Sequence, residues 1–166
     1  MKQTAAISIE RPGRKPSAPT KLAFSQILVP TDFSSKSKAA VDYAVELARR
    51  LGAQVTLLHV VREPTPFDYS MSGVPDGQWE QVREDADKKL DEECARAKLS
   101  YERVDSLVRT GTGLHEQIVS AVREVSADLV VLSTHGYSGW KLFFFGSGAE
   151  QLVHESPCPV LVVRSQ

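Results

Sequence analysis

The stretch 130–148 holds the residues best suited to binding chemistry, because an apolar run there leads through glycines into a helix-like segment. Glycine allows the backbone to approach a ligand closely, and Gly136, Gly146 and Gly148 are spread along this stretch. Backbone N–H groups at a helix N-terminus attract anions, and phosphates in particular. The stretch therefore predicts a loop that binds a phosphate group.

Ser147 has two interpretations within this loop. The segment Ser147-Gly148-Ala149-Glu150 has the S-x-x-E spacing of a capping box, in which the serine hydroxyl satisfies the N–H groups of its own helix. In the second interpretation, the hydroxyl and the neighbouring N–H groups contact a phosphate, helped by the helix dipole. A cap can rotate toward a ligand, so the spacing leaves both roles open.

Asp32 is the second candidate, because it follows the apolar run 26–30 after the turn at Pro30 and Thr31. A carboxylate at the carboxyl end of a strand can accept a hydrogen bond from a ribose hydroxyl or an adenine amino group, or it can hold Mg²⁺. The alternative role is to cap the following helix, which contributes roughly 0.3–1 kcal/mol. We favour the ligand role because Pro30 restricts the turn that carries Asp32.

Apolar runs and helical periodicities alternate along the chain, and they predict the elements that position these residues. The expected strands are 26–30, 55–61, 104–108, 128–133 and 159–163. The expected helices are 35–51, 79–97, 114–125 and 147–156. Strict alternation of this kind predicts an α/β fold, a Rossmann-like open sheet of five parallel strands with four helices on its two faces. Ligands of such sheets bind beyond the carboxyl ends of the strands.

Length and composition limit the function classes. The 166 residues fit one core, and the formal net charge of -1 gives no indication of nucleic-acid or membrane binding. Cys94 and Cys158 lie too far apart for a metal-binding motif, and no metal site is expected. No apolar run approaches the roughly 18 residues of a membrane helix, and no secretory signal is evident, so we expect a cytoplasmic protein. Residues 1–24, rich in proline, are expected to form an extended or flexible leader to a domain at 25–166.

Several motifs, in order, resemble those of the universal stress protein family. Ser133-Thr134-His135-Gly136, nine further residues, and then Gly146-Ser147 are similar to the family's G-x2-G-x9-G-[S/T] signature. The segment 27–34, the strand segment 57–60 and the closing segment 156–164 resemble the corresponding parts of the family. The resemblance covers roughly residues 25–164 and implies a nucleotide-binding α/β fold with the strand order 3-2-1-4-5.

The resemblance implies a two-part site for ATP or another adenine nucleotide, with Mg²⁺. The residues around adenine and ribose would be Pro30, Thr31, Asp32 and Val60, with Val60 packed against the adenine ring. The residues around ribose and phosphates would be Ser133, Gly136, Gly146, Ser147 and Gly148. It also implies a homodimer through the closing strand, and an exposed apolar edge strand favours such pairing on physical grounds.

Two function hypotheses follow from these patterns. In the first, the protein is a stress-response module whose conformation and partners depend on a bound adenine nucleotide, with at most slow ATP hydrolysis and no catalytic residue that we can name. In the second, it binds no nucleotide and acts only through protein–protein association. Ser133 replaces the first glycine of the signature, and Ala149 lacks a hydroxyl that some family members offer to phosphates, which favours the second hypothesis. The P-loop and G-x-G-x-x-G motifs are absent from the sequence.

Overall fold

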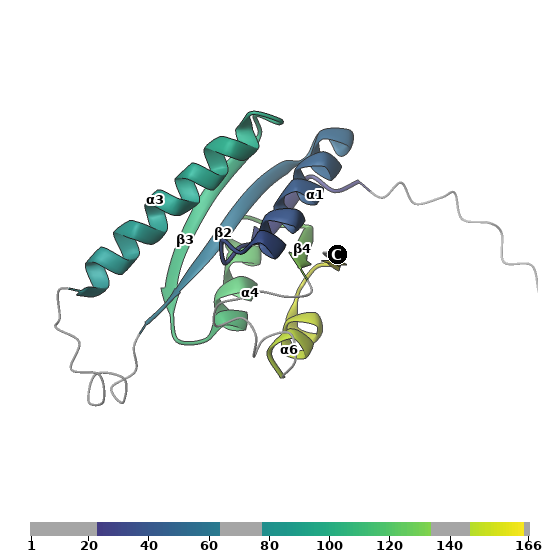
Figure 1. Cartoon of the computed structure of the whole chain (residues 1–166). Helices are drawn as coiled ribbons and strands as arrows, with labels where there is room; N and C mark the ends of the chain where they lie inside the picture. Colours follow the sequence, from purple (N-terminus) through teal and green to yellow (C-terminus); the bar gives the residue numbers. More distant parts are fainter. Residues whose placement is uncertain (1–22, 64–77, 134–146, 165–166) are drawn as a thin grey trace, which may run out of the picture.

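The computed structural model describes residues 23–63, 78–133 and 147–164. Strands and helices alternate along these residues, as the sequence predicts (Figure 1). The strands are β1 (Gln26–Pro30), β2 (Gln54–Arg62), β3 (Val104–Gly111), β4 (Leu129–Ser133) and β5 (Val160–Val163). The helices of the described residues are α1 (Ser35–Leu51), α3 (Gln78–Lys98), α4 (Leu114–Glu124) and α6 (Ser147–Glu155). The expected leader at 1–24 lies almost wholly outside the described ranges and stays a prediction.

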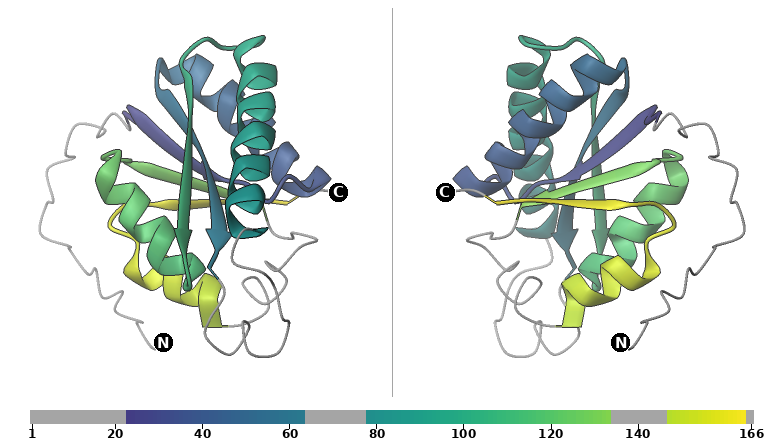
Figure 2. Two further views of the ribbon diagram at one scale, coloured as in Figure 1. Left: turned by 90° about the vertical axis from the view of Figure 1, so that its left-hand side faces the viewer. Right: turned by 90° about the vertical axis from the view of Figure 1, so that its right-hand side faces the viewer.

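The five strands form one parallel sheet in the order β3-β2-β1-β4-β5, which confirms the expected fold class. Helices α1 and α3 cover one face of the sheet, and α4 and α6 cover the other (Figure 2). Strands β1 and β4 are buried along nearly their whole length, because a central parallel strand has a helix layer on each side. The chain builds outward from β1 through β2 to β3, and then from β4 to β5 on the other side.

One expected strand is longer in the structure. Strand β3 runs to Gly111 rather than to Val108, because it pairs with β2 as far as Arg62 and backbone pairing does not need apolar side chains. Val82 fits the apolar periodicity of α3 but is 45% exposed, because the first turns of this helix extend past the described core. Cys94 is buried and Cys158 half-buried, both as free thiols.

Local signals set the ends of α1 as expected. The Ser34 hydroxyl accepts a hydrogen bond from the backbone N–H of Ser37 at 3.2 Å, which caps the first turn. Gly52 ends the helix with a φ of 71°, in the left-handed region that glycine adopts without strain. The helix therefore starts directly after the turn that carries Asp32. Among the residues the structure describes, none of the helices is both long and apolar enough to cross a membrane.

Candidate functional site

Pro30, Val60 and Ser133 lie toward the same carboxyl edge of the sheet, at the point where the strand order reverses. Strands β1 and β4 are parallel neighbours, with Leu28 opposite Val130, so Pro30 and Ser133 end their strands at the same edge. Strand β2 continues past Leu58, the partner of Pro30, and carries Val60 toward the same edge. The reversal point between neighbouring strands is where open α/β sheets bind ligands.

Thr31 is a structural brace of this edge. Its side chain is fully buried, and its hydroxyl donates to Glu93 Oε2 at 3.0 Å and accepts from the Phe33 N–H at 3.1 Å. Its backbone N–H donates to the Leu58 carbonyl at 2.8 Å. These bonds link β1, β2 and α3 at one point. We therefore expect Thr31 to hold the turn in place, and a direct contact with a ligand stays a prediction.

Asp32 supports the turn that leads into α1, whose N-cap is Ser34. Its Oδ1 accepts a hydrogen bond from the Ser34 N–H at 3.1 Å, directly before α1 begins. The residue is 8% exposed, at the end of β1 and beside the point where the strand order reverses. A carboxylate has lone pairs for several donors, so this turn bond does not exclude a ligand role. The ligand role of Asp32 stays a prediction.

His59 belongs to the structural support of the edge. Its ring stacks on Phe33, with the ring centroids 4.3 Å apart, and its Nδ1 lies 2.8 Å from the Thr31 carbonyl oxygen. Burial lowers the pKa of His59 below its ordinary value, although the bond to Thr31 opposes this shift. A neutral ring that donates from Nδ1 satisfies this geometry, so His59 has a structural role at this edge.

The structure describes some of the other expected site residues and not the rest. Val60 is 8% exposed and packs with Leu28 and Leu58 on the sheet face under α4, so a contact with an adenine ring stays a prediction. Ser133 is buried at the end of β4. The remaining four expected site residues are Gly136, Gly146, Ser147 and Gly148. Gly136 and Gly146 lie outside the described residues, whereas Ser147 and Gly148 begin α6, which supports the expected helix start.

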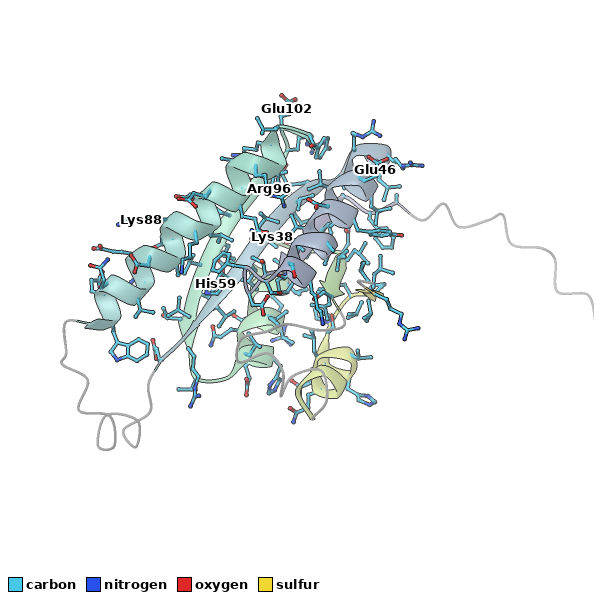
Figure 3. The ribbon with its side chains drawn as sticks, viewed as in Figure 1. Lys38, Glu46, His59, Lys88, Arg96 and Glu102 are labelled. Atoms are coloured by element: carbon cyan, nitrogen blue, oxygen red, sulfur yellow. The ribbon has the colours of Figure 1, made fainter. Side chains whose placement is uncertain are left out.

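Glu93 is an important residue that sequence reasoning missed. It is 5% exposed on α3, and Lys38 and Arg96 are charged groups near it. Figure 3 shows Lys38 and Arg96 at the space between α1 and α3. Burial is the main cause that raises the pKa of Glu93, and its bond to Thr31 together with Arg96 and Lys38 opposes the rise. The signal was present in the sequence, because Glu93 follows Leu90 by three residues and precedes Ala97 by four, on the apolar face of the helix.

The raised pKa of Glu93 predicts a pH-dependent free energy of unfolding. The folded state holds the Glu93 proton more tightly than the unfolded state, whose carboxyl titrates near 4.5. This contribution to stability is fully present below that value and is lost as pH rises through the folded-state pKa, by about 1.4 kcal/mol for each unit of difference. Urea unfolding of the wild type and of Glu93→Gln from pH 4 to pH 8 should show the variant gaining relative stability as pH rises. If the difference in the free energy of unfolding between the two proteins does not change with pH, the pKa of Glu93 is not raised.

The sequence of this chain is similar to those of known proteins. The model of the universal stress protein family matches residues 23–164. Universal stress protein YxiE of Bacillus subtilis strain 168 is 31% identical over 148 residues, which cover 85% of this chain and 99% of YxiE. The chain belongs to the universal stress protein family. The resemblance carried by the sequence motifs is thus confirmed.

Solved structures of universal stress proteins share the fold. UspA from Lactobacillus plantarum is 26% identical with a TM-score of 0.68, over 84% of this chain and 97% of UspA. A universal stress protein in complex with cAMP is 22% identical, with a TM-score of 0.64 over 87% of this chain and 99% of that protein. The universal stress protein from Archaeoglobus fulgidus in complex with dAMP is 20% identical, with a TM-score of 0.61 over 85% of this chain and 98% of that protein. Because the two complexes are only 22% and 20% identical to this chain, the similarity shows a common fold and nothing further.

Proposed function

We propose that this universal stress protein binds an adenine nucleotide, ATP with Mg²⁺, at the carboxyl edge between β1 and β4. The observation that carries the proposal is the convergence of Pro30, Asp32, Val60 and Ser133 on the one edge where the strand order reverses. Two proteins of this fold have been solved with the adenine nucleotides cAMP and dAMP, which supports the choice of ligand class.

Each part of the nucleotide has a proposed partner. Asp32 accepts from a ribose hydroxyl or the adenine amino group, and Val60 lies against the adenine ring. Gly136, Gly146, Ser147 and Gly148 surround the phosphates at the N-terminus of α6, where the helix dipole favours negative charge. Mg²⁺ in proteins is commonly held by one or two carboxylates together with substrate phosphates. The described ranges contain no group of three or more acidic, histidine or cysteine side chains that could hold a metal ion.

The proposed cellular role is a stress-response module in the cytoplasm that works through nucleotide-dependent conformation and association. The proposed partner is a second copy of the chain, paired along β5. This strand lies at the edge of the sheet, and Val162 on it is 45% exposed. A sheet edge presents unpaired backbone groups, and an apolar one favours pairing with another chain.

Equilibrium binding tests the nucleotide proposal. Calorimetric titration of the purified chain with ATP and Mg²⁺ should give a dissociation constant below about 1 mM, the affinity of a weak but specific ligand. GTP in the same buffer should bind more weakly, because the adenine end is the part that Asp32 and Val60 recognise. ATP turnover should stay below about 1 s⁻¹, the low end of enzyme rates. An ATP dissociation constant weaker than millimolar would instead favour the second candidate, a family member that binds no nucleotide, as Ser133 and Ala149 suggest.

A further inference from the structure

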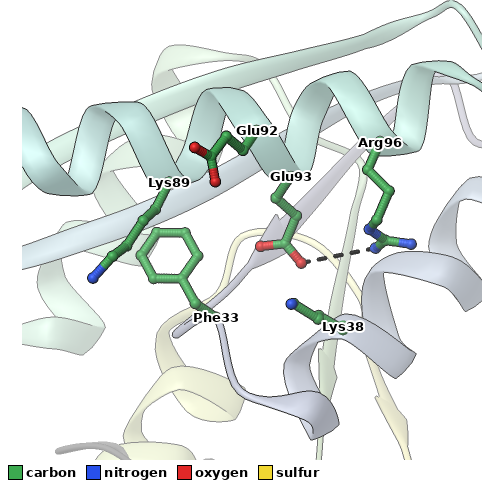
Figure 4. A pocket seen from close by; sticks show the side chains of 6 residues that line it. All are labelled: Phe33, Lys38, Lys89, Glu92, Glu93 and Arg96. Atoms are coloured by element: carbon green, nitrogen blue, oxygen red, sulfur yellow. Dashed lines mark ion pairs between the residues drawn. The ribbon is translucent and has the colours of Figure 1, made fainter.

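A cavity lies on the opposite side of the sheet from α4 and α6. It has a volume of about 370 Å³ and is lined by Phe33, Lys38, Lys89, Glu92, Glu93 and Arg96 (Figure 4). Lys38 comes from α1, the two glutamates, Lys89 and Arg96 come from α3, and Phe33 comes from the turn after β1. We call this cavity the Glu93 pocket. Its volume lies within the range of small-molecule sites in proteins, near the lower end.

One oxygen of the buried Glu93 carboxylate lacks a hydrogen-bond donor among the described residues. The side chain is only 3% exposed, and its Oε2 accepts from the Thr31 hydroxyl. Its Oε1 is buried and has no hydrogen-bond partner among the described residues. Arg96 approaches this oxygen only to 3.9 Å and instead donates to Asp42 at 2.7 Å. Buried polar atoms rarely lack a hydrogen-bond partner. We therefore expect Oε1 to accept a hydrogen bond from a group that is not among the described residues.

Cationic and aromatic groups surround this carboxylate. Lys38 is one of the positive charges that act on the Glu93 carboxyl, and Figure 4 shows Lys38 and Lys89 on opposite sides of the Phe33 ring. Neither lysine forms an ion pair with another described residue. The His59 ring stacks behind Phe33 and holds it in place. The pocket thus combines a buried acceptor, a fixed apolar ring and two available cations.

We propose that the Glu93 pocket binds a small amino acid. The ligand's ammonium group donates to Glu93 Oε1, and its carboxylate lies against Lys38 or Lys89. A simple anion would meet the carboxylates of Glu92 and Glu93, and a simple cation would meet Lys38, Lys89 and Arg96. A zwitterion matches both sets of charges and gains from charge-assisted hydrogen bonds at each end. This site does not depend on the nucleotide proposal, since it lies on the α1 and α3 face.

NMR titration of the full ¹⁵N-labelled chain, without nucleotide, tests the proposal. The probes are glycine, β-alanine and 4-aminobutanoate, which separate the two charged groups by increasing lengths, and butanoate and butylamine, which carry one charge each. At least one amino acid should shift the amide signals of 33–38 and 89–96 with a dissociation constant below about 10 mM. It should bind at least about tenfold more tightly than either single-charge probe. Absence of these shifts at about 50 mM, or equal binding of a single-charge probe, would overturn the proposal and leave an ordered water as the partner of Oε1.

Variants locate the two charged contacts. Glu93→Gln should weaken binding of the best amino acid at least about tenfold, because it removes the charge that faces the ammonium group. Glu84→Gln is the matched control, since Glu84 is exposed on the same helix outside the pocket, and it should leave binding unchanged. The double variant Lys38→Met, Lys89→Met tests the carboxylate end and should produce a similar loss even if Glu93→Gln folds poorly. Unchanged affinity in either pocket variant with a native spectrum would overturn the assignment.

Discussion

Asp32→Asn is expected to weaken ATP binding at least about tenfold while leaving the fold intact. A hydrogen bond to a charged carboxylate contributes roughly 1.5–3 kcal/mol, which is more than a neutral amide provides. Asparagine keeps an oxygen where Asp32 Oδ1 accepts from the Ser34 N–H, so the turn before α1 is retained, and the N-cap Ser34 is unchanged. The free energy of unfolding should change by less than about 1 kcal/mol, through the lost charge near the helix N-terminus. Calorimetric titration and urea unfolding measure the two effects.

Asp105→Asn is the matched control for this experiment. Asp105 is an exposed carboxylate near the amino end of β3, at the opposite edge of the sheet from the proposed site, where it accepts from Gln54. This variant should bind ATP as the wild type does. If Asp32→Asn also binds ATP with unchanged affinity, Asp32 serves only the turn in which it accepts from the Ser34 N–H.

Val162→Asp is expected to convert the proposed homodimer into monomers. Val162 is 45% exposed on the edge strand β5, and its register partner is Leu132 of the neighbouring strand β4. An aspartate there would place an unpaired charge in the strand-to-strand interface, at a penalty of roughly 3–5 kcal/mol. The dimer dissociation constant should therefore rise at least about 100-fold. Sedimentation equilibrium over a range of protein concentrations measures this change.

Leu99→Asp provides the comparison for the dimer experiment. Leu99 is 88% exposed after the end of α3, next to β3 on the other edge of the sheet, so the same charge there should leave the dimer unchanged. A dimer that persists in Val162→Asp would place the interface on another surface. A wild-type chain that is monomeric at micromolar concentration would remove the dimer from the proposed function.

The expected elements and the observed ones agree because their signals are local. Ser34 caps α1 and Gly52 ends it, and both roles follow from the chemistry of a few neighbouring residues. The apolar run 129–133 became the fully buried strand β4, because a strand with helices on both sides must be apolar on both faces. The parallel sheet then follows from the alternation of strand and helix.

The sequence alone also determined which edge of the sheet to consider, since ligand sites of such folds lie at the carboxyl ends of the strands. It predicted Pro30, Asp32 and Ser133 there, and the structure places all three at that edge. It left open whether Asp32 caps α1 or contacts a ligand. In the structure Ser34 is the N-cap and Asp32 accepts from the Ser34 N–H, so the ligand role stays a prediction. The phosphate-loop residues Gly136 and Gly146 lie outside the described chain and stay predictions.

Only the tertiary structure decided the partners of buried polar groups. Thr31 and Glu93 lie 62 residues apart in sequence, yet their side chains form a buried hydrogen bond between the end of β1 and α3. Helical periodicity could place Glu93 on an inner face, but it could not name the donor for one carboxylate oxygen or show that the other lacks one. Periodicity describes one element at a time. The satisfaction of a buried charge depends on how several elements pack together, and that packing created the Glu93 pocket.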